Sequence, residues 1–365
     1  MRHQRSVLFT CYVISMVLLR TRKIIFGACL LLGCFGSLAV IAQELDENAE
    51  AAFADFLLEF RMEAIAKGIR PETLDAVLPG ITLTRQAIVA DRNQPEFNNT
   101  FAVYLQRVSP WRMENGRKVL REQGDMIRPA AAGHGVPPQY VLAILGIESN
   151  YGSYPLTLSV FDVVATLAFD KRRSAQFRNE LLANFEILDK GYATFDGMKS
   201  SWAGALGYPQ FNASNYLKLA VDQDGDGMKD LWSMGPDVIG SVANYLKTTG
   251  WQGDETWGYE VNLPAAAEQS LMGEQSAGLS PDPSCKRFTT FGIWRTVQQW
   301  QALGVRMLDG ADLPDQSLPA ALIMGDEGQN KGYLIQRNFC SIMGYNPASK
   351  YAVAIGLLAD EISKQ

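Results

Sequence analysis

The sequence contains almost no histidine. Its two histidines are His3, close to the N-terminus, and His134, in a glycine-containing stretch that is typical of a loop. Two isolated imidazoles support neither a zinc site nor a Ser-His-Asp triad, because each of these needs histidine beside further ligands or a nucleophile. The chemistry of this protein is therefore expected from other residue types.

An excess of basic charge is also missing. The 365 residues include 33 Lys and Arg against 39 Asp and Glu, which gives a net charge of −6. Five of the basic residues lie among the first 42 residues, which hold no acid, so without them 28 basic residues face 39 acidic ones, a net charge of −11. Because nucleic-acid binding depends on clustered positive charge, we expect no nucleic-acid partner.

Long apolar runs are confined to residues 1–42. They cover residues 7–19 and 24–41, the second run follows basic residues, and polar sequence begins at Gln43. This pattern predicts an export signal peptide, with the mature chain starting near Gln43. The stretch LLGC, which ends at Cys34, leaves lipidation as an alternative, and an uncleaved helix would be a membrane anchor. The apolar residues after Cys34 favour ordinary cleavage.

Cysteine is scarce once this leader is removed. Three of the five cysteines lie inside it, and only Cys285 and Cys340 remain. Export places these two in an oxidising compartment, where a disulfide is favoured over two buried thiols, although both fit the sequence.

Composition and periodicity divide the rest of the chain into four parts. Residues 43–135 show helical spacing and predict an N-terminal α-lobe, while residues 136–251 contain most of the motifs and are the expected core. Residues 252–340 include the short β-type runs WGYEVNL, ALIMG and GYLIQRNF around a long loop, and predict a small β-containing insert. Residues 341–365 predict a C-terminal helix that packs on the core. The expected fold class is mostly α, with a minor β part (α+β).

One glutamate stands at the end of the most apolar helical stretch, in AILGIESNYGSYP. Pro138 can begin a helix that residues 140–147 continue with apolar side chains almost all round, and Gly152 is placed to end it. Glu148 then lies in the last turn, where burial and the helix dipole should raise its pKa above the reference value near 4.3. Such an acid is suited to donate a proton at neutral pH, whereas a Glu turned to solvent is the plain alternative.

The segment SSWAGALGYPQF, residues 200–211, concentrates small residues between aromatic ones. Glycine lets the backbone approach a ligand closely, while aromatic faces and a side-chain amide suit sugar rings and their substituents. A tight packing contact within the protein would explain the same composition. Taken alone, the segment is weak evidence for a sugar site.

A loop rich in aspartate and glycine covers residues 222–233, DQDGDGMKDLWS. It has the odd-position oxygen groups and the central glycine, Gly227, of an EF-hand-type Ca²⁺ loop. The expected ligands are Asp222, Asp224, Asp226, Met228 and Asp230. Position 12 is Ser233 instead of the usual Glu, and Asp237 follows four residues later. A loop closed by its own Asx turns is the alternative.

Together these motifs resemble a known family. GIESNYG, SWAGALGYPQF, AVDQDGDGMKDLW, GSVANYLKTTGW and YNPASKYAVAIG follow the order and spacing found in the soluble and membrane-bound lytic transglycosylases of family B, which cleave bacterial peptidoglycan. The resemblance covers nearly all of the chain after residue 42. It implies a goose-lysozyme-like core flanked by an α-lobe and a smaller β-containing lobe, with the glycan bound in the groove between them.

The resemblance also implies roles for individual residues. The single catalytic acid and base of the family falls on Glu148. Positions of the family's motifs that would bind the sugar fall on Ser201, Tyr208, Gln210, Phe211, Tyr245, Tyr345 and Asn346, and less firmly on Tyr104 and on Arg173 of the pair Arg172-Arg173. The sequence departs from the family at Pro209, where Gly is usual, and in LWSMGPDVIGS, which is one residue longer than expected.

The implied reaction is cleavage of the MurNAc-β-1,4-GlcNAc bond with formation of a 1,6-anhydro-MurNAc end. It requires no cofactor for the chemistry and leaves room for a structural Ca²⁺. The expected setting is the periplasm of a Gram-negative-type bacterium, where a monomer acts on glycan strands, with cell-wall synthesis or division complexes as candidate partners. Two alternatives are a hydrolytic muramidase, in which Asp162 or another acid positions water, and a noncatalytic glycan-binding scaffold. The joint presence of Glu148, Ser201 and Gln210 disfavours the scaffold.

Overall fold

The computed structural model describes residues 48–93, 99–253, 255–264, 267, 284–285, 293–314, 317–326 and 330–364. By their contacts, the residues divide into a unit of residues 1–59 and a unit of residues 60–365. The predicted leader over residues 1–42 and most of the predicted loop over 265–284 lie outside the described residues. None of the helices in the described part of the chain is long and apolar enough to cross a membrane.

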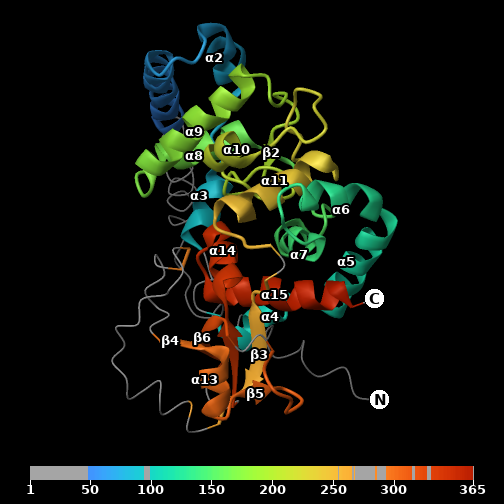
Figure 1. The fold of residues 1–365 in the computed structure, drawn as a ribbon. Helices are drawn as coiled ribbons and strands as arrows, with labels where there is room; N and C mark the ends of the chain where they lie inside the picture. The colour runs from blue at the N-terminus through green and yellow to red at the C-terminus, as the bar shows by residue number, and fades with distance from the viewer. Residues whose placement is uncertain are drawn as a thin grey trace, which may run out of the picture. The chain divides into compact units, whose positions relative to one another are not determined.

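The described chain is mostly helical, which confirms the predicted fold class (Figure 1). Proline begins several helices, and at α5 the hydroxyl of Ser109 also caps the helix by accepting the N–H of Arg112 at 3.3 Å. Residues 48–66 form the first described helix. The helices that follow are α2 (Pro71–Val77), η1 (Leu78–Gly80), α3 (Arg85–Arg92), α4 (Phe101–Leu105), α5 (Pro110–Glu122), α6 (Gly124–Ala132), α7 (Pro138–Ser149), α8 (Val160–Phe169), α9 (Ser174–Asp189), α10 (Ala213–Leu219), α11 (Pro236–Thr248), α13 (Val297–Ala302), α14 (Arg337–Tyr345) and α15 (Ser349–Ser363).

Helix α7 is the central helix of the second unit. Every side chain from Tyr140 to Ile147 is buried, because α5, α6, α11 and α15 pack around it. A helix that is apolar all round is stable only when neighbours cover all of its faces. This arrangement confirms the prediction of a buried helix at these residues.

The end of α7 differs from the prediction. Gly152 was expected to end the helix, but the helix already ends at Ser149, and Asn150 takes the left-handed conformation with φ of 56°. Tyr151 follows at 58° and Gly152 at 78°. Asparagine tolerates this region better than most residues with a Cβ, so Asn150 can act as the C-terminal cap two residues before Gly152.

The β-containing part is a five-stranded antiparallel sheet in the order β4-β6-β7-β3-β5. Its strands are β3 (Gly258–Asn262), β4 (Trp294–Thr296), β5 (Arg306–Met307), β6 (Pro319–Met324) and β7 (Lys331–Ile335). Two of the three predicted β-type runs are thus confirmed as β3 and β6. The third, GYLIQRNF, forms β7 only up to Ile335, and its last three residues begin α14. The indole of Trp300 on α13 fills the apolar face of the sheet with Val261 and Leu334, and its Nε1 donates to the carbonyl of Ala320 at 3.0 Å.

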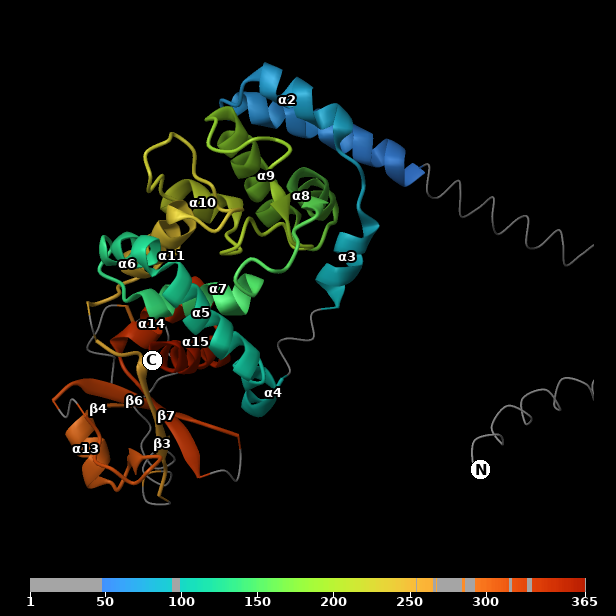
Figure 2. The same cartoon turned by 90° about the vertical axis from the view of Figure 1, so that its right-hand side faces the viewer.

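A small antiparallel pair, β1 (Leu158–Ser159) and β2 (Lys199–Ser200), lies within the helical part. In both views α15 lies between α7 and the five-stranded sheet (Figures 1 and 2). A disulfide joins Cys285 to Cys340 on α14, with 5.1 Å between the Cα atoms. It ties a segment of the insert to a helix whose last residue, Tyr345, reaches the cavity described below.

Asp360 on α15 connects this helix to Trp257, the residue just before β3. Its carboxylate accepts a hydrogen bond from Nε1 of Trp257 at 3.0 Å. A Cβ at Gly356 would lie 2.2 Å from the same indole, so Trp257 packs directly on the helix. Burial raises the pKa of Asp360 to about 6, although the hydrogen bond from Trp257 lowers it in part.

The substitution Asp360→Asn should therefore remove a pH dependence of folding stability. A carboxyl group whose folded pKa of about 6 exceeds the reference value of 3.8 stabilises the fold fully below about 3.8 and loses this contribution as the pH rises through about 6. Relative to the Asn variant, the unmodified protein should gain roughly 2–3 kcal/mol of unfolding free energy on acidification across that window. Urea unfolding of both proteins at several pH values measures this, and parallel pH curves would contradict the assignment.

Candidate active site

A cavity of about 670 Å³ lies in the second unit, at the C-terminal end of α7. Residues from α3, α4, α7, the 201–215 segment, α11, α14 and α15 line it. Segments from both ends of the 60–365 unit thus meet around one hollow. A volume of this size is typical of a small-molecule or oligosaccharide site.

Glu148 is the acidic group of this cavity. It is the second-last residue of α7, partly exposed, next to the buried Ile147. Of the described residues that line the cavity, Glu148 is the one with a carboxylate and Arg107 the one with a positive charge. Glu148 thus lies at the end of the apolar helix, as predicted, and lines the cavity.

Three tyrosines and Phe211 cluster beside this carboxylate. The ring of Tyr345 lies 4.5 Å from that of Tyr245 and 6.3 Å from that of Tyr351, and Phe211 lies 5.3 Å from Tyr245. Loss of hydration, followed by the negative charge of Glu148, raises the pKa of both Tyr345 and Tyr351 well above the ordinary value. Both hydroxyl groups therefore stay protonated and are hydrogen-bond donors at neutral pH.

The turn after Glu148 is fixed by Tyr151. Its hydroxyl donates to the backbone carbonyl of Arg112 at 2.7 Å, and Nε of Arg112 donates to the carbonyl of Gly146 at 2.9 Å. A Cβ at Gly146 would lie 2.7 Å from the Tyr151 hydroxyl, and one at Gly116 on α5 would lie 2.6 Å from it. The left-handed residues after the helix are thus held by a side chain packed between two glycines.

The 200–211 segment forms a tight loop of its own. Leu206 bridges to Ser200 and to Phe211, and Gln210 has φ of 54° while its Nε2 donates to the carbonyl of Gly207 at 2.8 Å. A Cβ at Gly207 would lie 2.2 Å from the carbonyl oxygen of Leu231. The glycine at 207 is therefore needed for packing within the protein, which was the alternative explanation of this composition.

Pro209, the departure from the family pattern, lies in this loop. Its carbonyl accepts a hydrogen bond from the hydroxyl of Tyr345. The hydroxyl of Ser201 accepts the N–H of Ala205 at 3.3 Å, and Ser201 and Gln210 both line the cavity.

Most of the residues expected to bind sugar line the cavity. In the segment that follows β2 these are Ser201, Gln210 and Phe211, and elsewhere Tyr104, Tyr245, Tyr345 and Asn346. Arg107, Trp202, Asn215 and Tyr351 also line it but were not predicted. Trp202 is 38% exposed and follows Ser201 directly, so its neighbourhood in the motif was a usable signal.

Two predicted sugar-binding residues lie outside the lining. The ring of Tyr208 packs on Gly152, where a Cβ would lie 2.3 Å from it. Arg173, like Arg172, forms an ion pair with Asp91 of α3, which is only 2% exposed. A buried carboxylate needs such partners, so the two arginines hold α3 in place instead of facing the cavity.

Asp162, considered as a second catalytic acid, has a structural partner. Its carboxylate accepts the backbone N–H of Thr82 at 2.9 Å, and its own N–H donates to the hydroxyl of Ser159 at 3.4 Å. It does not belong to the residues that line the cavity. Asp170 likewise pairs with Arg92 at 2.8 Å.

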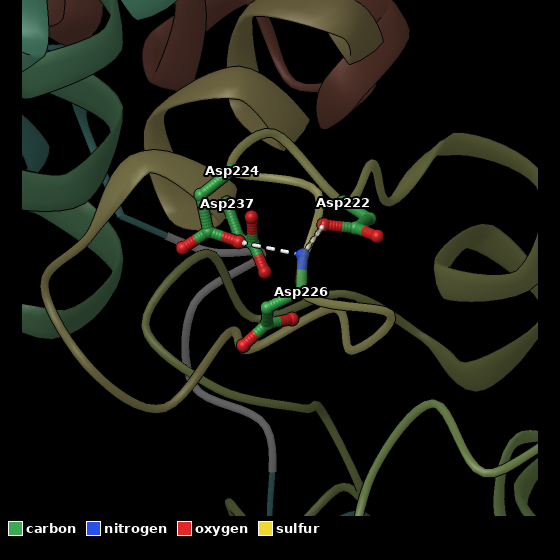
Figure 3. Close-up of side chains that lie close together, drawn as sticks. All are labelled: Asp222, Asp224, Asp226 and Asp237. Atoms are coloured by element: carbon green, nitrogen blue, oxygen red, sulfur yellow. Dashed lines mark hydrogen bonds between the residues drawn. The ribbon is translucent and has the colours of Figure 1, made fainter.

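The aspartate-rich loop brings four carboxylates together between α10 and α11. Oxygen atoms of Asp222, Asp224, Asp226 and Asp237 lie within 4.8 Å of one another (Figure 3). Three backbone N–H groups, those of residues 225–227, also point at Asp222 at 2.7–3.1 Å, as in an Asx turn.

One predicted ligand is replaced by another. Asp230 does not belong to this group, because its carboxylate accepts the N–H of Trp232 at 2.8 Å. Its place is taken by Asp237 in the first turn of α11, which is 4% exposed and accepts the N–H groups of Gln223 and Asp230 at 2.7 and 2.8 Å. Burial, and then the charges of Asp224 and Asp222, raise the pKa of Asp237. Met228 donates its backbone N–H to Asp226 at 2.7 Å.

The chain is similar to proteins of one known family. The family model described as transglycosylase SLT domain matches residues 52–360. The chain is 30% identical over 262 residues to membrane-bound lytic murein transglycosylase B of Escherichia coli (strain K12). The matched residues make up 70% of this chain and 65% of the length of that relative.

Two solved structures are similar over most of the chain. SltB3 from Pseudomonas aeruginosa, in complex with NAG-anhNAM-pentapeptide, gives a TM-score of 0.77 at 35% identity and covers 86% of this chain and 80% of that one. Slt35 from Escherichia coli, in complex with calcium, gives 0.67 at 27% identity and covers 84% and 92%. The chain belongs to the transglycosylase SLT domain family.

The packing around Tyr151 predicts the effect of one substitution. Gly146→Ala places a methyl group 2.7 Å from the Tyr151 hydroxyl, so either the ring or the turn after Glu148 must move. We expect a loss of about 1–3 kcal/mol in the free energy of unfolding. Gly133→Ala is the matched control, since a Cβ there meets only ordinary contacts at 3.5 Å or more. Equal unfolding free energies for the two variants would contradict the packing described here.

Proposed function

We propose that this protein is a lytic transglycosylase that cleaves the MurNAc-β-1,4-GlcNAc bond of peptidoglycan and leaves 1,6-anhydro-MurNAc ends. The observation that carries the proposal is that Glu148 is the one carboxylate among the described residues that line the cavity. Glycosidases that use water or a protein nucleophile need two carboxyl groups across the scissile bond. A site with one carboxylate fits a reaction in which the substrate provides its own nucleophile.

In this mechanism Glu148 acts twice. Its protonated carboxyl donates to the oxygen that links MurNAc C1 to GlcNAc, and the C1–O bond breaks as the acetamido oxygen of the same MurNAc stabilises C1. The resulting carboxylate then takes the proton of the C6 hydroxyl while O6 forms a bond to C1 and displaces the acetamido oxygen. Glu148 ends the cycle protonated, no water is consumed, and no cofactor is needed.

The surrounding groups suit the sugar. Tyr345 and Tyr351 keep their protons and place neutral hydroxyl groups beside the carboxylate, and the Tyr345 hydroxyl, which donates to the carbonyl of Pro209, can still accept a hydrogen bond. Ser201 and Gln210 present a hydroxyl and an amide at the lining, which suit an acetamido group and ring hydroxyls. Trp202, partly exposed, offers an aromatic face. The complex of the relative SltB3 with NAG-anhNAM-pentapeptide supports a substrate of this class.

The substitution Glu148→Gln tests the proposal. Removing the proposed acid should lower turnover of purified glycan strands by about a thousandfold or more, because both proton transfers are lost, while glycan binding survives. Mass spectrometry of the products separates the two reactions: anhydro ends are one water lighter than the reducing ends that a muramidase would form. Hydrated products, or a Gln variant that still turns over, would refute the mechanism, and binding without any turnover by the unmodified protein would favour a scaffold.

We also propose that the aspartate-rich loop binds a structural Ca²⁺ through Asp222, Asp224, Asp226 and Asp237. The donors are all hard carboxylate oxygens. Burial and, after it, the charges of Asp224 and Asp222 raise the pKa of Asp237, and a bound cation would offset the repulsion between these charges. The calcium complex of the relative Slt35 is consistent with this. The ion would hold the start of α11, whose Tyr245 lines the cavity, and would take no part in the chemistry.

Thermal unfolding with millimolar CaCl₂ or with chelator tests the calcium proposal. Binding to the folded state alone should raise the melting temperature in CaCl₂ by a few degrees. Asp224→Asn should abolish this increase, whereas Asp230→Asn should keep it, because Asp230 lies outside the four carboxylates. A melting temperature that ignores both CaCl₂ and chelator would reject the site and leave the loop closed by its own Asx turns.

The setting proposed for this activity is the periplasm, reached through the leader over residues 1–42, with glycan strands as the partner and a monomer as the working form. Lipidation at Cys34 would instead place the enzyme on a membrane surface, and the mass of the mature N-terminus distinguishes these outcomes.

A further inference from the structure

The short helix α4 is capped from the five-stranded sheet. The backbone N–H groups of Phe101 and Ala102 donate to the two carboxylate oxygens of Asp326, at 2.9 and 2.7 Å. Asp326 is the second residue after the end of β6 and lies 225 residues from Phe101 in the sequence. The next N–H, that of Val103, donates to the hydroxyl of Thr100 at 3.3 Å. The first three N–H groups of this helix are thus satisfied by side chains.

A helix of five residues depends on such partners. One turn of helix is unfavourable alone, because its few hydrogen bonds do not offset the cost of ordering the backbone. The carboxylate of Asp326 accepts two hydrogen bonds, and hydrogen bonds to a carboxylate are stronger than those to a neutral cap. The position of α4 is therefore set from outside its own sequence.

Further contacts fix the same end of α4. The ring of Phe101 stacks on that of Tyr333 in β7, with 5.6 Å between centroids and 25° between planes. From the helical side, Nζ of Lys350 on α15 donates to the carbonyl of Asn99 and lies 6.0 Å from the Phe101 ring. The N-terminal end of α4 is thus held between the β6–β7 hairpin and α15.

The other end of α4 reaches the candidate active site. Tyr104 on the helix and Arg107 just after it both line the cavity, and the Arg107 guanidinium lies 4.9 Å from the centre of the Tyr104 ring. Tyr104 lines the same cavity as Tyr351 and Glu148. Both Tyr104 and Arg107 line the cavity with groups that can contact a sugar, an aromatic ring and a guanidinium, and neither is the proposed acid.

We propose that the β6–β7 hairpin supports the sugar-binding wall of the cavity and that Asp326 is a positioning residue, which acts through α4 on Tyr104 and Arg107. This inference rests on the proposed function and assigns a role in glycan binding to the β-containing insert. Loss of the cap should displace a binding group and leave the proton transfers of Glu148 intact. Loss of the cap should therefore raise KM and lower the affinity for glycan, while kcat stays nearly constant.

The first test measures binding and turnover of Asp326→Ala. In the inactive Glu148→Gln background, isothermal titration with a GlcNAc-MurNAc tetrasaccharide should show affinity reduced about three- to tenfold, as for the loss of a helix cap. With Glu148 intact, KM on soluble glycan strands should rise by the same factor, with kcat changed less than about twofold. Asp326→Asn keeps one acceptor and should give an intermediate loss. The Asp326→Asn variant provides the same test if the Ala variant does not fold. Asp312→Ala, an exposed carboxylate of the same insert, is the control and should bind normally.

The second test asks whether Asp326 acts through α4. In a Tyr104→Ala/Arg107→Ala background, Asp326→Ala should cause no further loss of affinity, because the groups that it positions are gone. The same fractional loss in both backgrounds, a fall in kcat at constant KM, or unchanged affinity in Asp326→Ala and Asp326→Asn would each overturn the inference. If the protein with Asp326 intact neither binds nor cleaves the glycan, it is the proposed function that fails.

Discussion

The position of Glu148 depends on the contact between the Tyr151 hydroxyl and the backbone of α5 and α7. The hydroxyl reaches the carbonyl of Arg112 at 2.7 Å only because Gly116 and Gly146 leave room for it. This contact holds two non-glycine residues in the left-handed region directly after the helix. Strain of this kind is kept only where the surrounding packing over-determines it, and here the turn follows the fully packed helix α7 and contacts the backbone of α5.

Three aspartates around the cavity have a similar structural role. Asp91 pairs with Arg172 and Arg173, Asp162 accepts a backbone N–H from the segment before α3, and Asp326 caps α4. Each of these carboxylates links segments far apart in the sequence and holds a part of the chain near the cavity. Glu148 differs because it faces the cavity, where a proton can be passed to a ligand.

The walls of the cavity thus owe their positions partly to residues that do not line it. Helix α3 is tied to α8 and the residues after it by Arg172, Arg173 and Asp170, and α4 is tied to the sheet and to α15. The sheet is in turn joined to α15 through Trp257, Gly356 and Asp360. This chain of contacts explains how a β-containing insert far along the sequence can influence a site in a helical core.

The sequence by itself determined the features that are local. An apolar run with proline at its start predicts the buried helix α7, β-type runs predict β3, β6 and β7, and ordered motifs mark Glu148, Ser201 and Gln210. It misplaced the end of α7, because Asn150 competes with Gly152 for the left-handed position and the outcome depends on how Tyr151 packs.

Only the tertiary structure decided which charged residues face the cavity. Arg173 matched its motif yet turns to Asp91, while Arg107, which sequence spacing did not single out, lines the cavity. In the aspartate-rich loop, likewise, the carboxylate of Asp230 accepts the N–H of Trp232, and it is Asp237 that joins the other three carboxylates. The physical reason is that a long or buried charged side chain settles on whichever partner relieves its desolvation best. Partners such as Asp91 and Asp326 are brought near by folding, and distance along the sequence carries no information about them.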